Sequence, residues 1–202
     1  GLEPQGVTIT GDLEKVLSTT QPQVMVDFTQ PEAVFANATL AINYNVSQVI
    51  GTTGLTQNQL DEIHVLCERK QLGAVIASNF ALGAVLMMRF AREAAKYFRH
   101  VEIIELHHNQ KLDAPSGTAL STVQAILEER GQFKQGHPQE FESVAGSRGG
   151  EIQGVRVHSV RLPGLIAHQE VLFGDLGQTL SIRHDSLSRE SFIPGVLLAI
   201  RK

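Results

Sequence analysis

The sequence has little of several features that define whole classes of protein. Cys67 is the only cysteine among 202 residues, which excludes an intramolecular disulfide framework and a metal site built from cysteines. No apolar run approaches the roughly 18 residues of a membrane helix. The first ten residues, GLEPQGVTIT, lack a basic stretch followed by an apolar one, so they do not resemble a signal peptide. We therefore expect a soluble protein of a reducing, cytoplasmic compartment.

An excess of positive charge is also missing. The formal net charge is -4, which argues against broad binding to nucleic acid, although a local basic cluster can still bind a small anion. Apolar residues make up 42% of the chain and charged residues 19%, which excludes disorder and a fibrous architecture. The length is sufficient for a sizeable core and allows one large domain or two small ones.

The first part of the chain alternates short apolar runs with helical periods, which is typical of βαβ units on a parallel sheet. Two sequences indicate helix starts: Thr29 to Glu32 predicts a capping box with proline in the first turn, and Thr56 to Gln59 predicts a second capping box. Ligands of such sheets bind beyond the carboxyl ends of the strands, so the turns there are expected to line one crevice. The predicted strands are 24–28, 47–50 and 72–77.

The second part predicts an α+β arrangement. A polar, glycine-rich segment at 132–150 indicates a loop, and the turn signals Pro163-Gly164 and Gly177 separate strands. The predicted helices are 82–98, 118–130 and 192–202, and the predicted strands are 101–108, 155–162, 165–173 and 179–184.

One stretch places proton donors beside a candidate anion site, at the end of a predicted strand and the start of a helix. If Pro115 or Ser116 begins that helix, the N–H groups of Gly117 and Thr118 point outward, where the helix dipole attracts a carboxylate. Lys111 lies within loop distance and adds a full positive charge. The pattern therefore predicts a site for a small organic anion.

Two adjacent histidines precede this helix. Strand alternation places His107 and His108 on opposite faces, so both serve one pocket only if the strand ends there. One histidine could then bind the substrate while the other, or Lys111, gives up a proton, because imidazole titrates near neutrality. The spacing alone does not choose among the three side chains.

Each motif has a simpler interpretation when it stands alone. A histidine pair at a strand end is more often a solvated polar pair, and Ser-Gly-Thr before a helix is mostly a cap. The turn Gly51 to Gly54 is equally weak evidence of a ligand site. Adjacent histidines with opposed side chains make a poor chelate, so we expect no metal site.

Together these segments resemble the dihydrodipicolinate reductase family, and their sequence is most similar to that of its bacterial, especially cyanobacterial, members. The most specific match is the family pattern E-x-H-H-x-x-K-x-D-A-P-S-G-T-A at residues 105–119. Further matches cover most of the chain: Val26 to Thr29 with Pro31-Glu32, Gly51 to Gly54, Ser78 to Phe80, His158 to Arg161, Gly164, His168 to Glu170, and Arg183 to Asp185 through Pro194-Gly195.

The resemblance implies reduction of dihydrodipicolinate, formed from 4-hydroxy-tetrahydrodipicolinate, to tetrahydrodipicolinate in lysine and diaminopimelate biosynthesis, with NADH or NADPH as the cofactor. It implies that His107 and Lys111 are catalytic. The substrate-binding residues that it implies are His108, Lys111, Ser116, Gly117, Thr118 and Arg189. The residues that it places near the nicotinamide are Phe28, Thr29, Gly51, Thr53, Ala77, Asn79 and Phe80.

The resemblance also implies an α/β fold with two domains. Residues 1–78 with 191–202 would form an incomplete, Rossmann-like dinucleotide-binding domain, and residues 79–190 a substrate-binding domain with a mixed sheet that assembles a homotetramer. The family's leading strand and glycine-rich turn have no counterpart in these residues, so we expect them to be missing from the N-terminal side, and the choice between NADH and NADPH stays open. Two other functions remain open: an anion-binding scaffold without turnover, and a different dehydrogenase on the same architecture.

Overall fold

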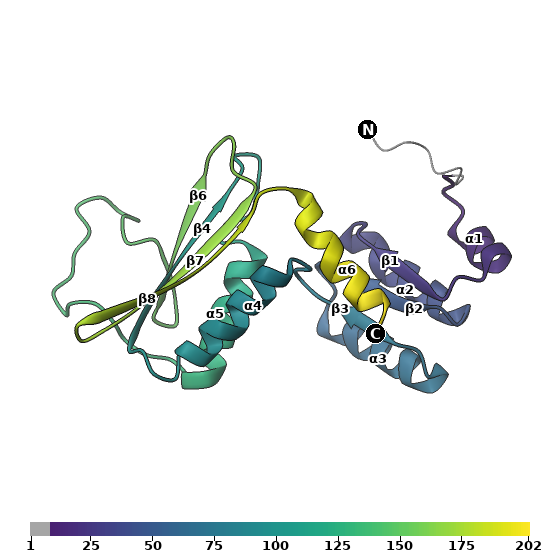
Figure 1. Ribbon diagram of the computed structural model, residues 1–202, viewed down its shortest axis with the longest axis horizontal. Coiled ribbons are helices and arrows are strands. Elements are labelled where there is room, and N and C mark those ends of the chain that lie inside the picture. The colour runs from purple at the N-terminus through teal and green to yellow at the C-terminus, as the bar shows by residue number, and fades with distance from the viewer. Residues whose placement is uncertain (1–8) are drawn as a thin grey trace. The chain divides into compact units, whose positions relative to one another are not determined.

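The computed structural model describes residues 9–202 (Figure 1), so the first eight residues of the predicted nucleotide domain lie outside the described residues. The chain forms two compact units, one ending at Ser78 and joined by residues 197–202, and the other comprising residues 79–196. A parallel sheet of three strands and a mixed sheet of five strands confirm the predicted α/β class. Within residues 9–202, no helix combines the length and the apolar character that a membrane crossing requires.

The first unit is a small parallel sheet with helices packed on it. Its strands lie in the order β1-β2-β3, and all are parallel, as predicted. Helix α2 packs on β1 and β2, and α3 packs against α2. The buried residues that hold this unit together are Val34, Ala38, Ile42, Ile50, Ile63 and Cys67. Its elements are α1 (Leu13–Thr20), β1 (Val24–Asp27), α2 (Pro31–Asn43), β2 (Ser47–Ile50), α3 (Gln57–Lys70) and β3 (Ala74–Ile76).

The two predicted capping boxes had different outcomes. The second is confirmed: the Thr56 hydroxyl accepts from the Gln59 amide, and the Gln59 side chain accepts from Thr56. The first is wrong as to the cap, because Gln30 is the N-cap and makes no side-chain bond, while the Thr29 hydroxyl donates to Asp27 instead; the helix nevertheless begins at Pro31, with proline in the first turn as predicted. Helix α1 was also missed, since it has only eight residues, about two turns, and buries only one side chain.

The second unit is built on a mixed sheet in the order β5-β6-β4-β7-β8. Strand β4 is parallel to β6 and antiparallel to β7, so β6 and β7, which follow each other in the sequence, are separated by β4. The short edge strand β5 was not predicted. The elements are α4 (Leu82–Ala94), β4 (His100–His107), α5 (Gly117–Arg130), β5 (Gly150–Ile152), β6 (Val155–Arg161), β7 (Ala167–Asp175), β8 (Gln178–Ser186), the 3-10 helix η1 (Arg189–Phe192) and α6 (Ile193–Ile200).

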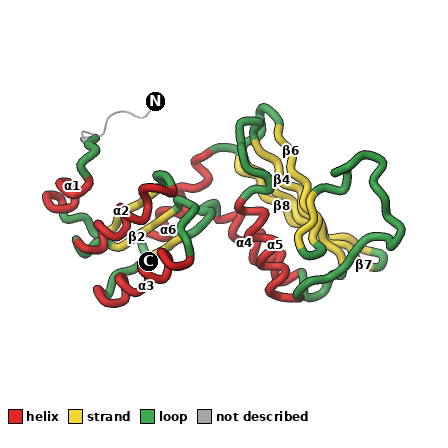
Figure 2. Tube along the Cα trace, turned by 180° about the vertical axis from the view of Figure 1, so that it is seen from behind, coloured by secondary structure: helices red, strands yellow, loops and turns green. Residues whose placement is uncertain are grey.

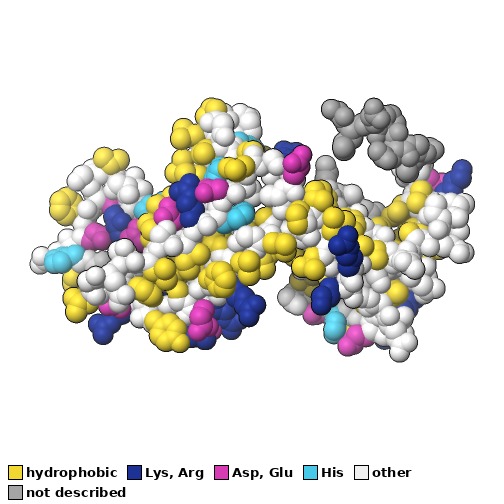
Figure 3. All heavy atoms as spheres, viewed as in Figure 1, with side chains coloured by type: hydrophobic (Ala, Val, Ile, Leu, Met, Phe, Trp, Pro, Cys, Tyr) yellow, Lys and Arg dark blue, Asp and Glu magenta, His cyan; other side chains and the backbone are white. Residues whose placement is uncertain are grey.

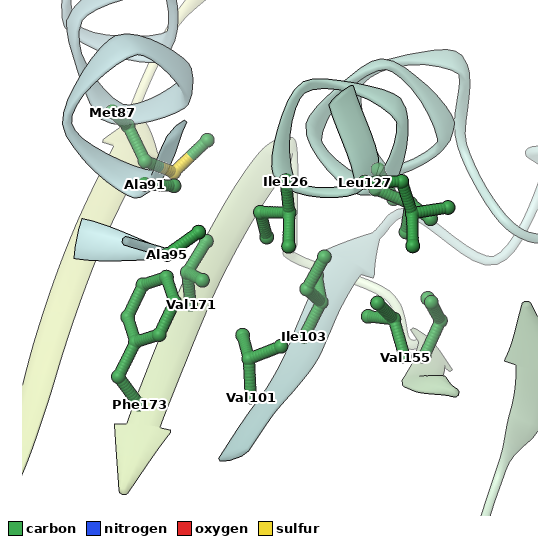
Figure 4. Packing of buried hydrophobic residues seen from close by; sticks show 13 residues of the cluster. Met87, Ala91, Ala95, Val101, Ile103, Ile126, Leu127, Val155, Val171 and Phe173 are labelled. Carbon is green, nitrogen blue, oxygen red and sulfur yellow. The ribbon is translucent and has the colours of Figure 1, made fainter. Parts of the chain in front are cut away.

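Helices α4 and α5 cover one face of this sheet (Figure 2), and the main core of the unit lies between them and the strands. Side chains of both helices point toward the strands in Figure 4, where Met87 and Ile126 approach Ile103, Val171 and Phe173. Because strand side chains alternate between faces, the residues of β4 that face the helices are Val101, Ile103, Glu105 and His107. A charged residue and a histidine thus share the face that builds the core.

The core predicts one stability experiment. Phe173 is 1% exposed, and its ring lies tilted against that of Phe98 with the centroids 5.8 Å apart, so Phe173→Ala should lower the free energy of unfolding by about 3–5 kcal/mol through lost burial and a residual cavity. Leu176→Ala, at a position that is 94% exposed in the β7–β8 turn, should change it little. Chemical denaturation measures both, and equal effects would contradict the packing described.

Candidate active site

The start of helix α5 is open to solvent and capped as the sequence predicts. Ser116 is the N-cap, and its hydroxyl accepts from the Ala119 amide. That bond leaves the N–H groups of Gly117 and Thr118 in the first turn without an acceptor among residues 9–202. A Cβ atom on Gly117 would meet nothing within 4 Å, so an anion can approach the backbone closely. The combination of free amides and the helix dipole suits a carboxylate.

Strand β4 ends at His107, which separates the two adjacent histidines. His107 is on the helix-covered face of the strand and is largely buried, with a side chain that is 13% exposed. His108 follows in the loop, where its backbone carbonyl accepts from the Lys111 amide. The strand therefore ends between the two histidines, which is the condition for both to serve one pocket, and only His107 belongs to the sheet.

A buried carboxylate holds His107. The Glu105 side chain is fully buried, and its Oε2 lies 2.5 Å from Nδ1 of His107. The Arg161 guanidinium donates to both carboxylate oxygens, over 2.7 and 3.0 Å. Burial alone would raise the pKa of Glu105, but hydrogen bonds with His107, Arg161 and Ser159 outweigh burial and lower that pKa to about 2. Glu105 is therefore a carboxylate at neutral pH.

The Lys111 ammonium group is paired rather than free. Its Nζ donates to Asp113 Oδ1 over 2.6 Å, and this hydrogen bond is the main reason that the pKa of Asp113 is lowered. The Asp113 side chain is 61% exposed, so the pair contributes little stability. A second carboxylate, from a ligand, can thus compete for Lys111 at low cost.

A small cavity of about 20 Å³ connects several of these residues within the second unit. Its volume is sufficient for one water molecule. His107 and Thr118 line it together with two histidines, His168 of β7 and His184 of β8. Thr118 also accepts from Asn79, whose Nδ2 lies 3.0 Å from the hydroxyl oxygen. The structure therefore joins Asn79, predicted to lie near the cofactor, with Thr118, predicted to bind the substrate.

His168 and His184 are not among the site residues predicted from the sequence. His168 Nδ1 lies 2.7 Å from Asp185 Oδ1, and Asp185 also accepts from Arg183. Burial lowers the pKa of His184, whose ring lies against Gly83. Figure 3 shows acidic, basic and histidine side chains adjoining one another over the strands of this unit. Only the pairing of β7 with β8, which places His168 opposite Asp185, brings these residues together.

Glu105 and Arg161 were also missed as site residues, although both fall within the segments of family resemblance. The only available signal was a charged residue in an apolar strand, two positions before a histidine. Arg189, in contrast, was predicted to bind the substrate. It is exposed in η1 and makes no hydrogen bond or ion pair with the 107–118 loop in the part of the chain that the structure describes.

In the first unit, the buried Asp27 joins the turns after β1 and β2. Its carboxylate accepts from the backbone and hydroxyl of Thr29, from the Thr52 hydroxyl and from the Asn37 amide, all within 3.0 Å. Burial raises the pKa of Asp27, but these four hydrogen bonds together lower it. Thr53 was predicted to lie near the cofactor, whereas the buried Thr52 is the residue whose hydroxyl binds Asp27 and so holds the two turns together.

Two of the predicted cofactor residues lie against each other. A Cβ on Gly51 would come within 2.7 Å of three Phe28 ring atoms, so no larger residue fits under this ring. The Phe28 side chain is half exposed at 52%, and Thr53, two residues after Gly51, is exposed. Ala77 follows β3, where its amide donates to the Ile50 carbonyl. In the second unit, Phe80 is buried, and its carbonyl lies against Gly195.

Comparison with known proteins covers both units. Residues 1–80 match the family profile described as the N-terminus of dihydrodipicolinate reductase, and residues 83–202 match the one described as its C-terminus. The 4-hydroxy-tetrahydrodipicolinate reductase of Desulfitobacterium hafniense (strain DCB-2) is 59% identical over all 202 residues, which cover 76% of that relative. The reductase of the same name from Moorella thermoacetica is 58% identical over the whole chain, which covers 75% of it.

A solved structure gives the same result in three dimensions. The dipicolinate-bound dihydrodipicolinate reductase from Paenisporosarcina sp. TG-14 is 51% identical, with a TM-score of 0.89, over 100% of this chain and 76% of that one. The similarity thus extends over the whole chain and is not confined to the segment around the two histidines.

The Asp27 network predicts a pH-dependent loss of stability. Asp27→Asn turns one acceptor into an amide donor that faces other donors, so the free energy of unfolding at pH 7 should fall by about 1–3 kcal/mol. A carboxyl with a lowered folded pKa stabilises the protein above its unfolded pKa of about 3.9, and this contribution is lost as the pH falls through the folded pKa. The difference between variant and parent should therefore shrink in acid.

Urea unfolding at neutral and acidic pH measures this difference. Glu62→Gln is the matched control, because it removes an exposed carboxylate from the same unit, and it should leave the pH dependence unchanged. An Asp27→Asn variant as stable as the parent at pH 7 would contradict the assigned network.

Proposed function

The chain belongs to the dihydrodipicolinate reductase family, and we propose that it reduces dihydrodipicolinate, formed from 4-hydroxy-tetrahydrodipicolinate, to tetrahydrodipicolinate with NADH or NADPH. The observation that carries this proposal is the open N-terminus of α5 beside His107, with Lys111 in the loop that leads into the helix. It offers amides, a hydroxyl and cations to one small dianion. The relatives are named 4-hydroxy-tetrahydrodipicolinate reductase, and the proposed reaction is the reductive step of lysine and diaminopimelate biosynthesis.

The substrate is proposed to bind through its carboxylates. One carboxylate accepts from the amides of Gly117 and Thr118 and from the Thr118 hydroxyl, above the cap provided by Ser116. Lys111 leaves its ion pair with Asp113 and binds a substrate carboxylate instead. His108 and Arg189 contribute further positive charge or hydrogen bonds. Fixed donors of this kind orient a doubly negative ring and stabilise the charge that develops on it, which is where most of the rate enhancement arises.

His107 and Lys111 are the proposed proton donors or organisers of the reacting ring. With Nδ1 bound to Glu105, Nε2 of His107 has no other partner among residues 9–202. Lys111 has three donor hydrogens, of which Asp113 uses one. Lys111 can therefore deliver a proton to the ring while His107 holds it in place, or His107 can deliver one from Nε2 when both of its ring nitrogens are protonated.

Residues 1–78 together with residues 191–202 are the proposed cofactor domain. Residues 79–190 are the proposed substrate domain. The strand-end turns suit the nicotinamide end of the cofactor, because the half-exposed Phe28 ring, packed on the small Gly51, and the exposed Thr53 offer an aromatic surface beside a hydroxyl. Thr29, Ala77, Asn79 and Phe80 complete the proposed nicotinamide site. The bound nicotinamide supplies the hydride.

The proposed assembly is a homotetramer in the cytoplasm. Strands β5 and β8 are the two edges of the mixed sheet, and edges of this kind pair readily with another chain. Closed symmetric assembly is the usual way in which such surfaces are buried.

A titration tests the proposed function directly. Saturable binding of NADH or NADPH, oxidation of the cofactor in the presence of the substrate, and competition by dipicolinate are the expected results. Failure to bind either nicotinamide cofactor would contradict the proposal and favour a scaffold. Cofactor oxidation that dipicolinate does not inhibit would instead indicate a dehydrogenase with a different substrate.

Lys111→Ala should lower kcat by about 100-fold or more if this side chain delivers a proton. Lys134→Ala removes an exposed lysine of the long loop and should leave kcat unchanged. Steady-state kinetics separate the two roles, because an unchanged kcat with a raised KM would restrict Lys111 to binding.

Arg189→Ala should mainly raise the KM for the substrate, because a single cation that contacts a carboxylate contributes to binding in the ground state and the transition state alike. Substrate titration at saturating cofactor measures this change. An unaltered KM would remove Arg189 from the site.

A further inference from the structure

Glu105 and His107 are two positions apart on β4, so both side chains project from the same face of the strand. The Glu105 side chain has no exposed surface, and a buried carboxylate is stable only when its oxygens are paired. Its partners are the His107 ring, the Arg161 guanidinium and Ser159. Burying a charged carboxylate costs free energy, so we expect Glu105 to have a role other than packing.

Arg161 lies on β6 opposite His107 in the parallel register, which brings its guanidinium to Glu105. Besides the two bonds to Glu105, Nη2 donates to the backbone carbonyl of Asp113 over 2.8 Å. Arg161 thus connects the buried carboxylate with the loop that carries Lys111. The planar guanidinium holds the carboxylate plane in one orientation, which a lysine in its place would not do.

We propose that Glu105 and Arg161 are positioning residues of the reductase: Glu105 accepts from Nδ1–H of His107 and so keeps Nε2 free toward the cavity, while Arg161 fixes the Glu105 carboxylate. The catalytic consequence rests on the proposed function, whereas the state of the His107 ring does not. Glu105 can only accept, because its low pKa keeps it ionised at neutral pH. Nδ1 must therefore carry the proton.

Orientation, rather than charge, is the main effect of this arrangement. The charged and titratable groups around His107 are Glu105 on its own strand, Arg161 on β6, His168 on β7, His184 on β8, and Lys111 with Asp113 in the following loop. The positive charge of Arg161 offsets the negative charge of Glu105, as Lys111 and Asp113 offset each other. What remains is a directed hydrogen bond, which selects one tautomer and one ring orientation.

The same strand contains a matched control. Glu102 also pairs with a histidine and an arginine: its Oε2 lies 2.8 Å from His158 Nε2, and its Oε1 accepts from Arg148. Glu102 projects from the opposite face of β4. Its histidine is bound through Nε2, whereas His107 is bound through Nδ1, so the two rings should carry their protons on different nitrogens.

Histidine ¹⁵N NMR of the enzyme at neutral pH tests the proposal, with the His107 signal assigned by its loss in His107→Gln. In the parent, His107 should carry its proton on Nδ1 and His158 on Nε2. In Glu105→Gln, Arg161 should retain the amide oxygen, because it has no acceptor to offer the amide nitrogen. The NH₂ group of the substituted side chain then faces Nδ1, and the proton of His107 should move to Nε2.

Kinetics provide the second measurement. Glu105→Gln should lower kcat by about 10- to 100-fold, the usual effect of losing the partner that orients a functional histidine, with little change in the KM for the substrate. Glu102→Gln should alter only the His158 signal and leave kcat unchanged. A loss of folding alone would not produce a tautomer change with a preserved KM.

Three outcomes separate the hypotheses. A neutral His107 ring in the parent that carries its proton on Nε2 and not on Nδ1 overturns the positioning role, and this measurement requires no variant to fold. An active parent whose kcat and His107 tautomer are unaffected by Glu105→Gln also overturns it, while leaving the proposed function intact. A parent that does not oxidise the cofactor contradicts the proposed function, and the tautomer measurement then still decides whether Glu105 orients His107.

Discussion

Strand β4 is hydrogen-bonded along both sides, in parallel to β6 and antiparallel to β7, and the candidate site depends on this double pairing. One register places Arg161 opposite His107, and the other places Ala167 there, with His168 next to it. Because side chains alternate along a strand, a slip of one residue would turn Glu105 and His107 to the other face. The apolar residues Val101 and Ile103 oppose such a slip, since the core buries them on the same face.

The site therefore combines stability with function on one face of a strand. Val101 and Ile103 bury apolar surface under α4 and α5, whereas Glu105 and His107, at the end of the same row, bury polar groups. Burial of the carboxylate is compensated by hydrogen bonds that are geometrically specific, which is a weak source of stability but a strong constraint on orientation. A rigid strand holds His107, and the more exposed loop after it carries Lys111 and Asp113.

The two units use buried carboxylates in a similar way. Asp27 ties together the turns after β1 and β2, and Glu105 ties β4 to β6; both have lowered pKa values because hydrogen bonds outweigh burial. Neither carboxylate is among the residues that were expected to touch a ligand. Asp27 is bonded to Thr29, and Glu105 to His107. In both cases a carboxylate bonded to a predicted site residue, rather than the predicted residue itself, fixes the geometry.

The sequence by itself determined the α/β class, the βαβ order of the first unit, the cap at Ser116 and the family, because periodicity, capping chemistry and a long specific motif are local properties. It missed α1 and β5, which are short, and it predicted a capping box at Thr29 that does not form, because the Thr29 hydroxyl donates to Asp27. Only the tertiary structure decided that Arg161 binds Glu105 and that His168 and His184 adjoin His107. Their proximity depends on which strands pair and in which register, and pairing between distant segments leaves no local trace in the sequence.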